Sequence, residues 1–205
     1  MQSKWIKWAS EMQSIAQAGL AYSKDKYDLD RFNQLKDLSQ EIISEYTDVE
    51  VEKVRNLFDS EVGYLTPKVD VRGAVIKDNK ILLVKESNDG LWSMPGGWAD
   101  VNLSVSENII KEAKEEAGAD IIPKKLVAVL DRNKHNKPVS IQSIYKIFVL
   151  CDFVDGDFEE NTETEASQFF ELDKLPSLSE ARNTKEQINM CFDAYHKEDF
   201  EAIFD

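Results

Sequence analysis

Three glutamates form the part of this 205-residue sequence that is best suited to chemistry. Glu112, Glu115 and Glu116 lie within residues 104–118 (SVSENIIKEAKEEAG). Helical spacing places their carboxylates on one side of a helix, beside an apolar face that would be buried. Like charges at this spacing destabilise an isolated helix, so a compensating cation is expected, and oxygen ligands favour Mg²⁺, Mn²⁺ or Ca²⁺ over zinc. The alternative interpretation is a solvated acidic face with neighbouring lysines.

The sequence also marks the ends of this helix and the loop before it. Ser104 followed by Glu107 forms a capping box, which predicts the start of the helix, and Gly118 is a typical terminator. Gly96 and Gly97 precede the helix and allow the backbone to approach a metal or a phosphate closely. The glycine pair therefore favours a metal or phosphate site over a solvated acidic face.

The spacing of these residues resembles the Nudix box, G-x5-E-x7-R-E-U-x-E-E-x-G-U, where U is an aliphatic residue. Gly97 takes the place of the opening glycine, and residues 111–118 (KEAKEEAG) that of REUxEExG. The chain resembles a bacterial Nudix subgroup with an N-terminal helical domain, and the resemblance covers nearly its whole length. It implies a Nudix-type α/β/α sandwich with a mixed sheet and a bound Mg²⁺ or Mn²⁺. The implied metal ligands are the Gly96 carbonyl, Glu112, Glu115 and Glu116.

Two positions depart from the family pattern. Leu103 stands where the pattern has its first glutamate, and Lys111 replaces the arginine. Those two family positions usually form an ion pair, which this sequence cannot make. Glu107 and Glu115 each lie one turn from Lys111, so either could hold the lysine instead.

The resemblance implies chemistry on a pyrophosphate, where divalent ions neutralise charge and acidify the attacking water. In relatives, a base or a further metal ligand often comes from outside the helix. The acidic segment 155–165 (DGDFEENTETE) offers Glu163 as the first candidate and Glu165 as the second, and Glu115 of the box is a third. The alternative for the segment is a solubilising acidic loop.

Further residues near the box are candidates for substrate binding. They are Arg72, Lys85, Gly97, Trp98, Arg132, His135 and Lys146. The basic residues lie on predicted strands or in the basic stretch DRNKHNK, where they could meet substrate phosphates. Surface ion pairs and a solvated loop tip are the alternatives. Trp98 could stack on a base or cover the core.

Two regions must position these residues. Residues 1–66 carry three apolar stripes at helical spacing, with Asp48 as the expected N-cap of the third, which predicts a small all-α domain. Residues 67–205 alternate strand-like runs with the box helix and a second helix expected over 179–195. Asp78-Asn79 suits a hairpin turn. The expected fold class is α+β, a helical domain before a mixed α/β domain.

Composition narrows the class of protein. With 39 acidic and 25 basic residues the net charge is −14, which disfavours DNA as a partner. The apolar runs are too short for a membrane span, the start lacks the features of a secretory signal, and two cysteines make no disulfide framework. We therefore expect a cytoplasmic protein that does not bind membranes.

The first region holds more aromatic residues than so small a helical unit buries alone, which suggests a homodimer. In such a dimer the helical domain would line the active site of the partner, as the subgroup resemblance also implies. Intramolecular packing of these aromatic residues is the alternative.

The expected function is metal-dependent hydrolysis of the pyrophosphate bond in a nucleoside diphosphate linked to X, where X stands for the attached group. CDP-choline, UDP-linked compounds and ADP-ribose are the candidate substrates, and the products would be a nucleoside monophosphate and phospho-X. One alternative is action of the same metal site on RNA ends or 3′ termini. Another is a non-catalytic nucleotide sensor, against which the three intact glutamates argue.

Overall fold

The chain folds into two compact units in a computed structural model that describes residues 4–47, 49–59 and 63–205. The first unit runs up to Pro67 and also includes Val139–Ser143, and the second consists of Lys68–Pro138 and Ile144–Asp205. The main division falls one residue after the predicted boundary. The sequence does not predict that Val139–Ser143 joins the first unit, where Ile141 packs against the hydrophobic cluster of the helices.

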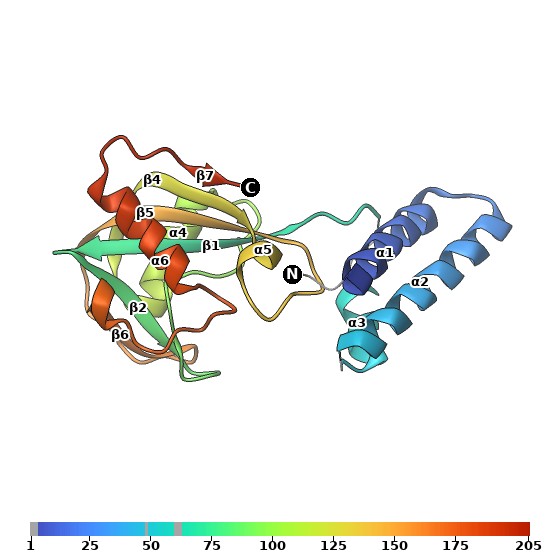
Figure 1. The fold of residues 1–205 in the computed structure, drawn as a ribbon, viewed down its shortest axis with the longest axis horizontal. Coiled ribbons are helices and arrows are strands. Elements are labelled where there is room, and N and C mark those ends of the chain that lie inside the picture. Colours follow the sequence, from blue (N-terminus) through green and yellow to red (C-terminus); the bar gives the residue numbers. More distant parts are fainter. Residues whose placement is uncertain (1–3, 48, 60–62) are drawn as a thin grey trace. The chain divides into compact units, whose positions relative to one another are not determined.

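The described residues of the first unit form three helices, in agreement with the three apolar stripes (Figure 1). They are α1 (Lys4–Tyr22), α2 (Lys26–Thr47) and α3 (Val51–Asp59). Asp25 caps α2 by accepting hydrogen bonds from the backbone N–H groups of Tyr27 and Asp28. The predicted N-cap of α3, Asp48, lies outside the described residues. The core of the unit is a small hydrophobic cluster of Ala9, Ile43, Val54 and Phe58.

Gln40 of α2 is a weak point of this helical unit. Its side chain is fully buried, and neither Oε1 nor Nε2 has a hydrogen-bond partner among the described residues. A buried polar atom without a partner costs about 1–3 kcal/mol. We therefore expect Gln40→Met, which keeps an unbranched side chain, to raise the free energy of unfolding by about 1–3 kcal/mol. Thermal unfolding checks this, and a lower melting temperature for the variant would contradict it.

The second unit is built on a mixed sheet of seven strands (Figure 1). The strands are β1 (Lys68–Lys77), β2 (Lys80–Glu86), β3 (Trp92–Ser93), β4 (Asp120–Asp131), β5 (Ile144–Asp155), β6 (Thr164–Glu171) and β7 (Ile203–Phe204). Their order is β3-β2-β1-β5-β4-β7, and β6 pairs with β2. The β1–β5 and β4–β7 pairs are parallel and the others are antiparallel. Asp78 and Asn79 form the predicted turn between β1 and β2, both with positive φ.

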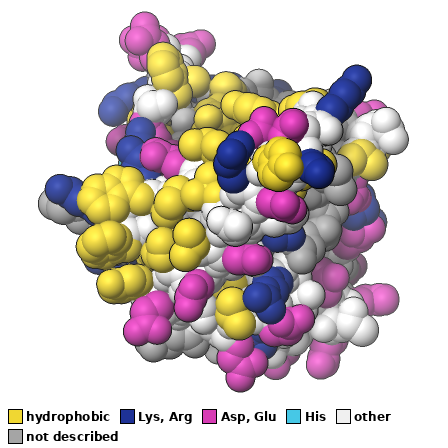
Figure 2. All heavy atoms as spheres, turned by 90° about the vertical axis from the view of Figure 1, so that its right-hand side faces the viewer, with side chains coloured by type: hydrophobic (Ala, Val, Ile, Leu, Met, Phe, Trp, Pro, Cys, Tyr) yellow, Lys and Arg dark blue, Asp and Glu magenta, His cyan; other side chains and the backbone are white. Residues whose placement is uncertain are grey.

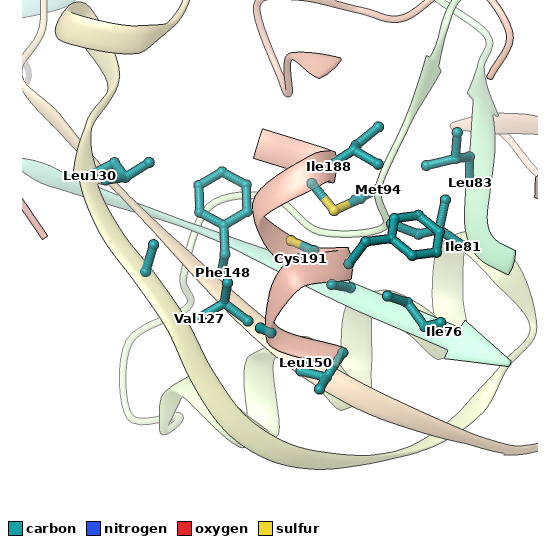
Figure 3. Packing of buried hydrophobic residues seen from close by; sticks show 14 residues of the cluster. Ile76, Ile81, Leu83, Met94, Val127, Leu130, Phe148, Leu150, Ile188 and Cys191 are labelled. Atoms are coloured by element: carbon teal, nitrogen blue, oxygen red, sulfur yellow. The ribbon is translucent and has the colours of Figure 1, made fainter. Parts of the chain in front are cut away.

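Helices cover both faces of this sheet. The covering helices are α4 (Val105–Ala117) and α6 (Lys185–His196), while the short α5 (Arg132–His135) follows β4 and a 3₁₀ turn lies at Leu172–Lys174. Ile109 and Ala113 of α4 pack in the cluster on one face. On the other face, Ile188 and Cys191 of α6 pack against Phe148 (Figure 3). The expected α/β/α sandwich is therefore confirmed.

The second predicted helix starts later than the sequence suggests. We expected it over residues 179–195, but α6 begins after the capping box of Thr184 and Gln187. Residues 177–183 instead form a loop that is bound to Trp92 by two backbone hydrogen bonds. No helix in the described residues is long and apolar enough to cross a membrane.

Candidate active site

The helix that carries the three glutamates is fixed at both ends. It begins at the predicted capping box, in which Ser104 Oγ accepts the N–H of Glu107 and Glu107 Oε2 accepts the N–H of Ser104. Gly118 ends it in the left-handed conformation, with φ at 67°. A Cβ at Gly118 would also collide with the carbonyl oxygen of Asp157. These contacts and the buried apolar face set both the position and the rotation of α4.

The glycine loop lies along β1. Gly73 N–H donates to the Pro95 carbonyl at 2.9 Å, and Val71 N–H donates to the Gly97 carbonyl at 2.8 Å. Gly96 has a φ of 139°, and a Cβ there would collide with the carbonyl oxygen of Val71. Only glycine fits at this position. The Gly96 carbonyl itself accepts no hydrogen bond from the described residues.

Glu116 joins the helix to this loop. The residue is only 6% exposed, and its Oε2 accepts the Gly96 N–H at 2.8 Å. Burial raises the pKa of Glu116 to about 7, against the opposing effects of Arg72 and of the Gly96 N–H. The negative charges of Glu86 and Glu112 raise this pKa further. A cation beside Glu116 would favour its ionised form and offset the cost of burying the carboxylate.

Glu112 lies against the second glycine. Its side chain is largely buried, and a Cβ on Gly97 would lie 3.3 Å from Glu112 Oε2. Burial raises the pKa of Glu112, although the charge of Lys111 opposes this. The fold thus brings two glutamates of the box next to the two glycines, which is the arrangement that the sequence pattern predicts.

The Glu115 carboxylate forms an ion pair with Lys111. Lys111 Nζ lies 3.0 Å from Glu115 Oε2 and 3.1 Å from Asp100 Oδ2. Glu115 is therefore one of the acids that hold Lys111, whereas Glu107 is used in the helix cap. Asp100 is a partner that the spacing does not predict. The Lys111–Asp100 ion pair ties the loop to α4, in place of the family ion pair that Leu103 cannot form.

The donor set at the glycines fits a hard divalent cation. It consists of two largely buried carboxylates, Glu112 and Glu116, and the Gly96 carbonyl, which has no partner among the described residues. In the part of the chain that the structure describes, no group of three or more His, Cys, Asp or Glu side chains is arranged to hold a metal. Mg²⁺ commonly uses only one or two protein carboxylates and keeps several waters. The residues present are of the chemical kind that such an ion uses.

Two predicted substrate-binding cations are buried around Asp70. Arg72 donates to Asp70 from Nε and Nη2, both at 2.9 Å, and Lys146 Nζ lies 2.7 Å from Asp70 Oδ1. Arg72 and Lys146 are 4% and 1% exposed. Arg132, also largely buried, donates from Nη1 to the Pro138 carbonyl at 2.7 Å. In this arrangement the three cations contact protein groups and are shielded from solvent.

Asp70, Arg72 and Lys146 form a buried charged cluster, and their charges shift one another's pKa values. Burial lowers the pKa of Lys146 to about 7, and the charge of Arg72 acts in the same direction against the pull of Asp70. Burial alone would raise the pKa of Asp70, but Arg72 and Lys146 outweigh it and lower that pKa below its usual value. Asp70 therefore stays ionised at neutral pH as the counter-ion of the cluster.

Lys85 and Glu165, two further predicted site residues, pair with each other. Lys85 Nζ lies 2.7 Å from Glu165 Oε2 across the neighbouring strands β2 and β6. Both side chains remain partly exposed. This is the ion pair that the sequence left open as the alternative for Lys85.

The acidic segment is attached to the last turn of α4. Asn161 Nδ2 donates to the Glu115 carbonyl at 3.1 Å, and Thr164 Oγ1 donates to the Glu116 carbonyl at 2.7 Å. Glu163, the first candidate base, lies between these two anchors and is exposed. Its backbone is therefore held close to the box helix.

Trp98 and His135 lie on exposed loops. Trp98 follows the glycines, is 52% exposed, and forms a backbone bridge with Asp70. His135 Nε2 lies 2.6 Å from Asp205 Oδ1, which attaches the end of α5 to the residue after β7. The structure thus leaves the Trp98 ring accessible beside the glycine loop, whereas His135 already has a carboxylate partner.

Sequence reasoning missed Asp70 and Asn183. Asp70 and Arg72 are two residues apart on one strand, so they share a face, and this signal was available in the sequence. Asn183 Oδ1 accepts the N–H of Met94 at 2.7 Å, across 89 residues of sequence. No local pattern indicates a contact of that kind.

Both regions of the chain match known protein families. Residues 67–190 match the NUDIX domain, and residues 3–58 match the UDP-X-like N-terminal oligomerisation domain. The chain is 47% identical over 205 residues to a Bacillus subtilis (strain 168) protein named "Putative ADP-ribose pyrophosphatase YjhB". That match covers 100% of this chain and 99% of the relative.

Two solved structures are also similar. The crystal structure of an ADP-ribose pyrophosphatase (SSU98_1448) from Streptococcus suis 89-1591 is 49% identical and has a TM-score of 0.64. It covers 68% of this chain and 100% of its own. The crystal structure of a UDP-X diphosphatase is 34% identical with a TM-score of 0.63, and covers 98% of this chain and 97% of its own.

Proposed function

The chain belongs to the Nudix family of pyrophosphatases, and we propose that it hydrolyses the pyrophosphate bond of a nucleoside diphosphate linked to X in a metal-dependent reaction. The products would be a nucleoside monophosphate and phospho-X. One observation carries this proposal: the buried Glu116 carboxylate accepts a hydrogen bond from the Gly96 N–H. The Gly96 carbonyl has no hydrogen-bond partner among the described residues, and Glu112 lies against the adjacent Gly97.

Glu112, Glu116 and the Gly96 carbonyl would hold Mg²⁺ or Mn²⁺. When bound, the ion supplies charge neutralisation at the phosphate oxygens and a more acidic water. Glu115 is a further ligand if its carboxylate leaves Lys111, which is possible because the Glu115 side chain is 58% exposed. The protein supplies a rigid loop and helix, so that the acids need little reorganisation.

The proton from the attacking water requires a base near the end of α4. We propose Glu163 for this role, because Asn161 and Thr164 fix its segment to the carbonyls of Glu115 and Glu116. Glu165 is the weaker candidate, since Lys85 already neutralises it. The exposed Trp98 ring is placed to stack on the base of a nucleotide.

The names of the relatives set the order of substrates to test. We propose ADP-ribose first, UDP-linked compounds second and CDP-choline third. We expect hydrolysis of at least one of them with Mg²⁺ or Mn²⁺, and loss of that activity on addition of EDTA. Chromatographic detection of the nucleoside monophosphate is the measurement. Binding that raises the melting temperature without product would favour a nucleotide sensor, and cleavage of short RNA alone would favour action on RNA ends.

We further propose that the helical unit makes the enzyme a homodimer. The match to an oligomerisation domain supports this, as do the exposed rings of Trp5, Trp8 and Tyr46, which are 49%, 45% and 54% exposed. Trp5 stacks on Tyr46 with ring centroids 5.6 Å apart. Hydrophobic side chains also gather in one area of the face drawn in Figure 2. Light scattering at micromolar protein should give the mass of two chains, and the mass of one chain would contradict the proposal.

A further inference from the structure

The peptide group of Met94 is held from two sides. Its N–H donates to Asn183 Oδ1 at 2.7 Å, and its carbonyl accepts a hydrogen bond from Arg72 Nη1 at 3.1 Å. Met94 and Asn183 are both fully buried. Met94 lies only two residues before Gly96, whose carbonyl belongs to the candidate metal site. A shift of the Met94 peptide would therefore move that carbonyl directly.

The other hydrogen bonds to this loop come from β1 and α4, which lie much earlier in the sequence than Asn183. β1 holds the carbonyls of Pro95 and Gly97 through backbone hydrogen bonds, and α4 holds the Gly96 N–H through Glu116. Asn183 is the contact that joins the loop to the segment leading into α6. Asn183 binds the first residue of the loop, because Met94 directly follows β3.

Asn183 is itself held in place. Its N–H donates to the Ser179 carbonyl at 2.9 Å, and Ser179 N–H donates to the Trp92 carbonyl at 2.9 Å. The adjacent Arg182 lies with Nε 2.9 Å from Glu86 Oε1 and with Nη1 3.1 Å from Asp89 Oδ2. The amide oxygen that meets Met94 therefore projects from a segment tied to both ends of the β2–β3 connection.

The oxygen and the nitrogen of the Asn183 side-chain amide differ in their contacts. Its Nδ2 is buried and has no hydrogen-bond partner among the described residues. A buried donor without a partner costs about 1–3 kcal/mol. Aspartate would keep an acceptor oxygen at this place but would add a negative charge when ionised, and leucine would fill a similar space with neither an acceptor nor a donor. These two substitutions separate the acceptor from the volume of the side chain.

We propose that Asn183 is a positioning residue for the metal site: by accepting the Met94 N–H, it sets the place of the Gly96 carbonyl relative to Glu112 and Glu116. This inference rests on the proposed function. Groups that orient metal ligands are typically worth about 10–100-fold in metal affinity. We expect Asn183→Leu to weaken Mn²⁺ binding by about 10-fold or more, and Asn183→Asp to stay within about threefold of the wild type.

Asn136→Leu is the matched control. Asn136 is a second buried amide bound to the same segment, with Nδ2 2.8 Å from the Glu180 carbonyl and Oδ1 accepting from Gln187 Nε2 at 2.8 Å. Its hydrogen bonds go to Glu180 and Gln187, and among the described residues none goes to Met94. Its loss should lower the melting temperature but change Mn²⁺ affinity by less than about threefold. A purely structural role of Asn183 would instead make the two leucine variants alike.

Mn²⁺ binding to the full metal-free chain is measured by electron paramagnetic resonance, and hydrogen exchange is followed at the amides of Met94, Gly96 and Gly97. Asn183→Leu should weaken binding and speed exchange at these amides, whereas Asn136→Leu should do neither. If Asn183→Leu does not fold, Asn183→Ser takes its place, because its hydroxyl is too short to reach Met94.

Wild-type Mn²⁺ affinity in the Asn183 variant, or equal weakening in the Asn136 variant, overturns the positioning role. A wild-type protein that binds no Mn²⁺ and hydrolyses no substrate overturns the proposed function instead. In that case unchanged exchange at the amides of Met94, Gly96 and Gly97 in Asn183→Leu would still refute the role of Asn183.

Discussion

Glu116→Gln should lower turnover by at least about 100-fold, while the protein stays folded. Glutamine fills the same volume but cannot supply the negative charge that a divalent ion requires. Glu116 is buried, and burial raises its pKa to about 7, so the folded state bears a cost for the ionised form. Neutral glutamine removes this cost, and the melting temperature should therefore be unchanged or higher. Steady-state kinetics on a substrate identified from the panel, with thermal unfolding in parallel, measures both effects.

Glu107→Gln is the matched control for this result. It makes the same chemical change on the same helix, but Glu107 serves the capping box, in which glutamine also works. Its turnover should remain close to that of the wild type. If Glu116→Gln kept most of the wild-type rate, Glu116 would not be a metal ligand, and the proposed mechanism would be wrong.

Asp70→Ala should lower the free energy of unfolding by about 3–5 kcal/mol, because it leaves Arg72 and Lys146 buried without their counter-ion. Asp70 is only 8% exposed and accepts hydrogen bonds from both cations. Arg72 cannot lose its proton at accessible pH, so its charge stays in the core without the carboxylate that directly pairs with it. Urea unfolding followed by circular dichroism measures the change.

Lys146→Met is the comparison that tests this explanation. Burial already lowers the pKa of Lys146 to about 7, so the neutral side chain costs the folded protein little, and Arg72 still neutralises Asp70. We expect a loss of less than about 1.5 kcal/mol. A loss as large as that of Asp70→Ala would mean that Lys146, and not the unpaired Arg72, dominates the energetics of the cluster.

The pH dependence of the Asp70 contribution follows from the sign of its shift. The folded-state pKa of Asp70 lies below its usual value, so the stabilisation is present above the unfolded-state pKa and is lost as pH falls through the folded-state pKa. Acid titration of the wild type should therefore show a steeper loss of stability than that of Asp70→Ala.

Local sequence patterns determined the elements of the site. The capping box at Ser104, the terminator Gly118 and the spacing of the glutamates predict α4 almost to the residue, because helix caps and periodicity depend on neighbours within a few positions. The two glycines before it predict a close approach of the backbone to a metal or a phosphate, and the structure adds that Gly96 lies against β1. The family resemblance that this motif carries implies the Nudix-type sandwich, and the alternation of strands and helices predicts a mixed α/β domain.

Only the tertiary structure decided which side chains meet. Lys146 is hydrogen-bonded to Asp70, 76 residues away in the sequence, and Lys85 to Glu165, 80 residues away. Asn183 is hydrogen-bonded to Met94, 89 residues away. The third pair joins two loops, the one after β3 and the one before α6. Strand order and register set the first two pairs, because a one-residue slip would turn each of those side chains to the opposite face. For this reason the sequence could propose Arg72 and Lys146 as phosphate-binding groups but could not place them around Asp70. The identity of the acids came from local spacing, and the environment of each acid came from contacts between distant parts of the chain.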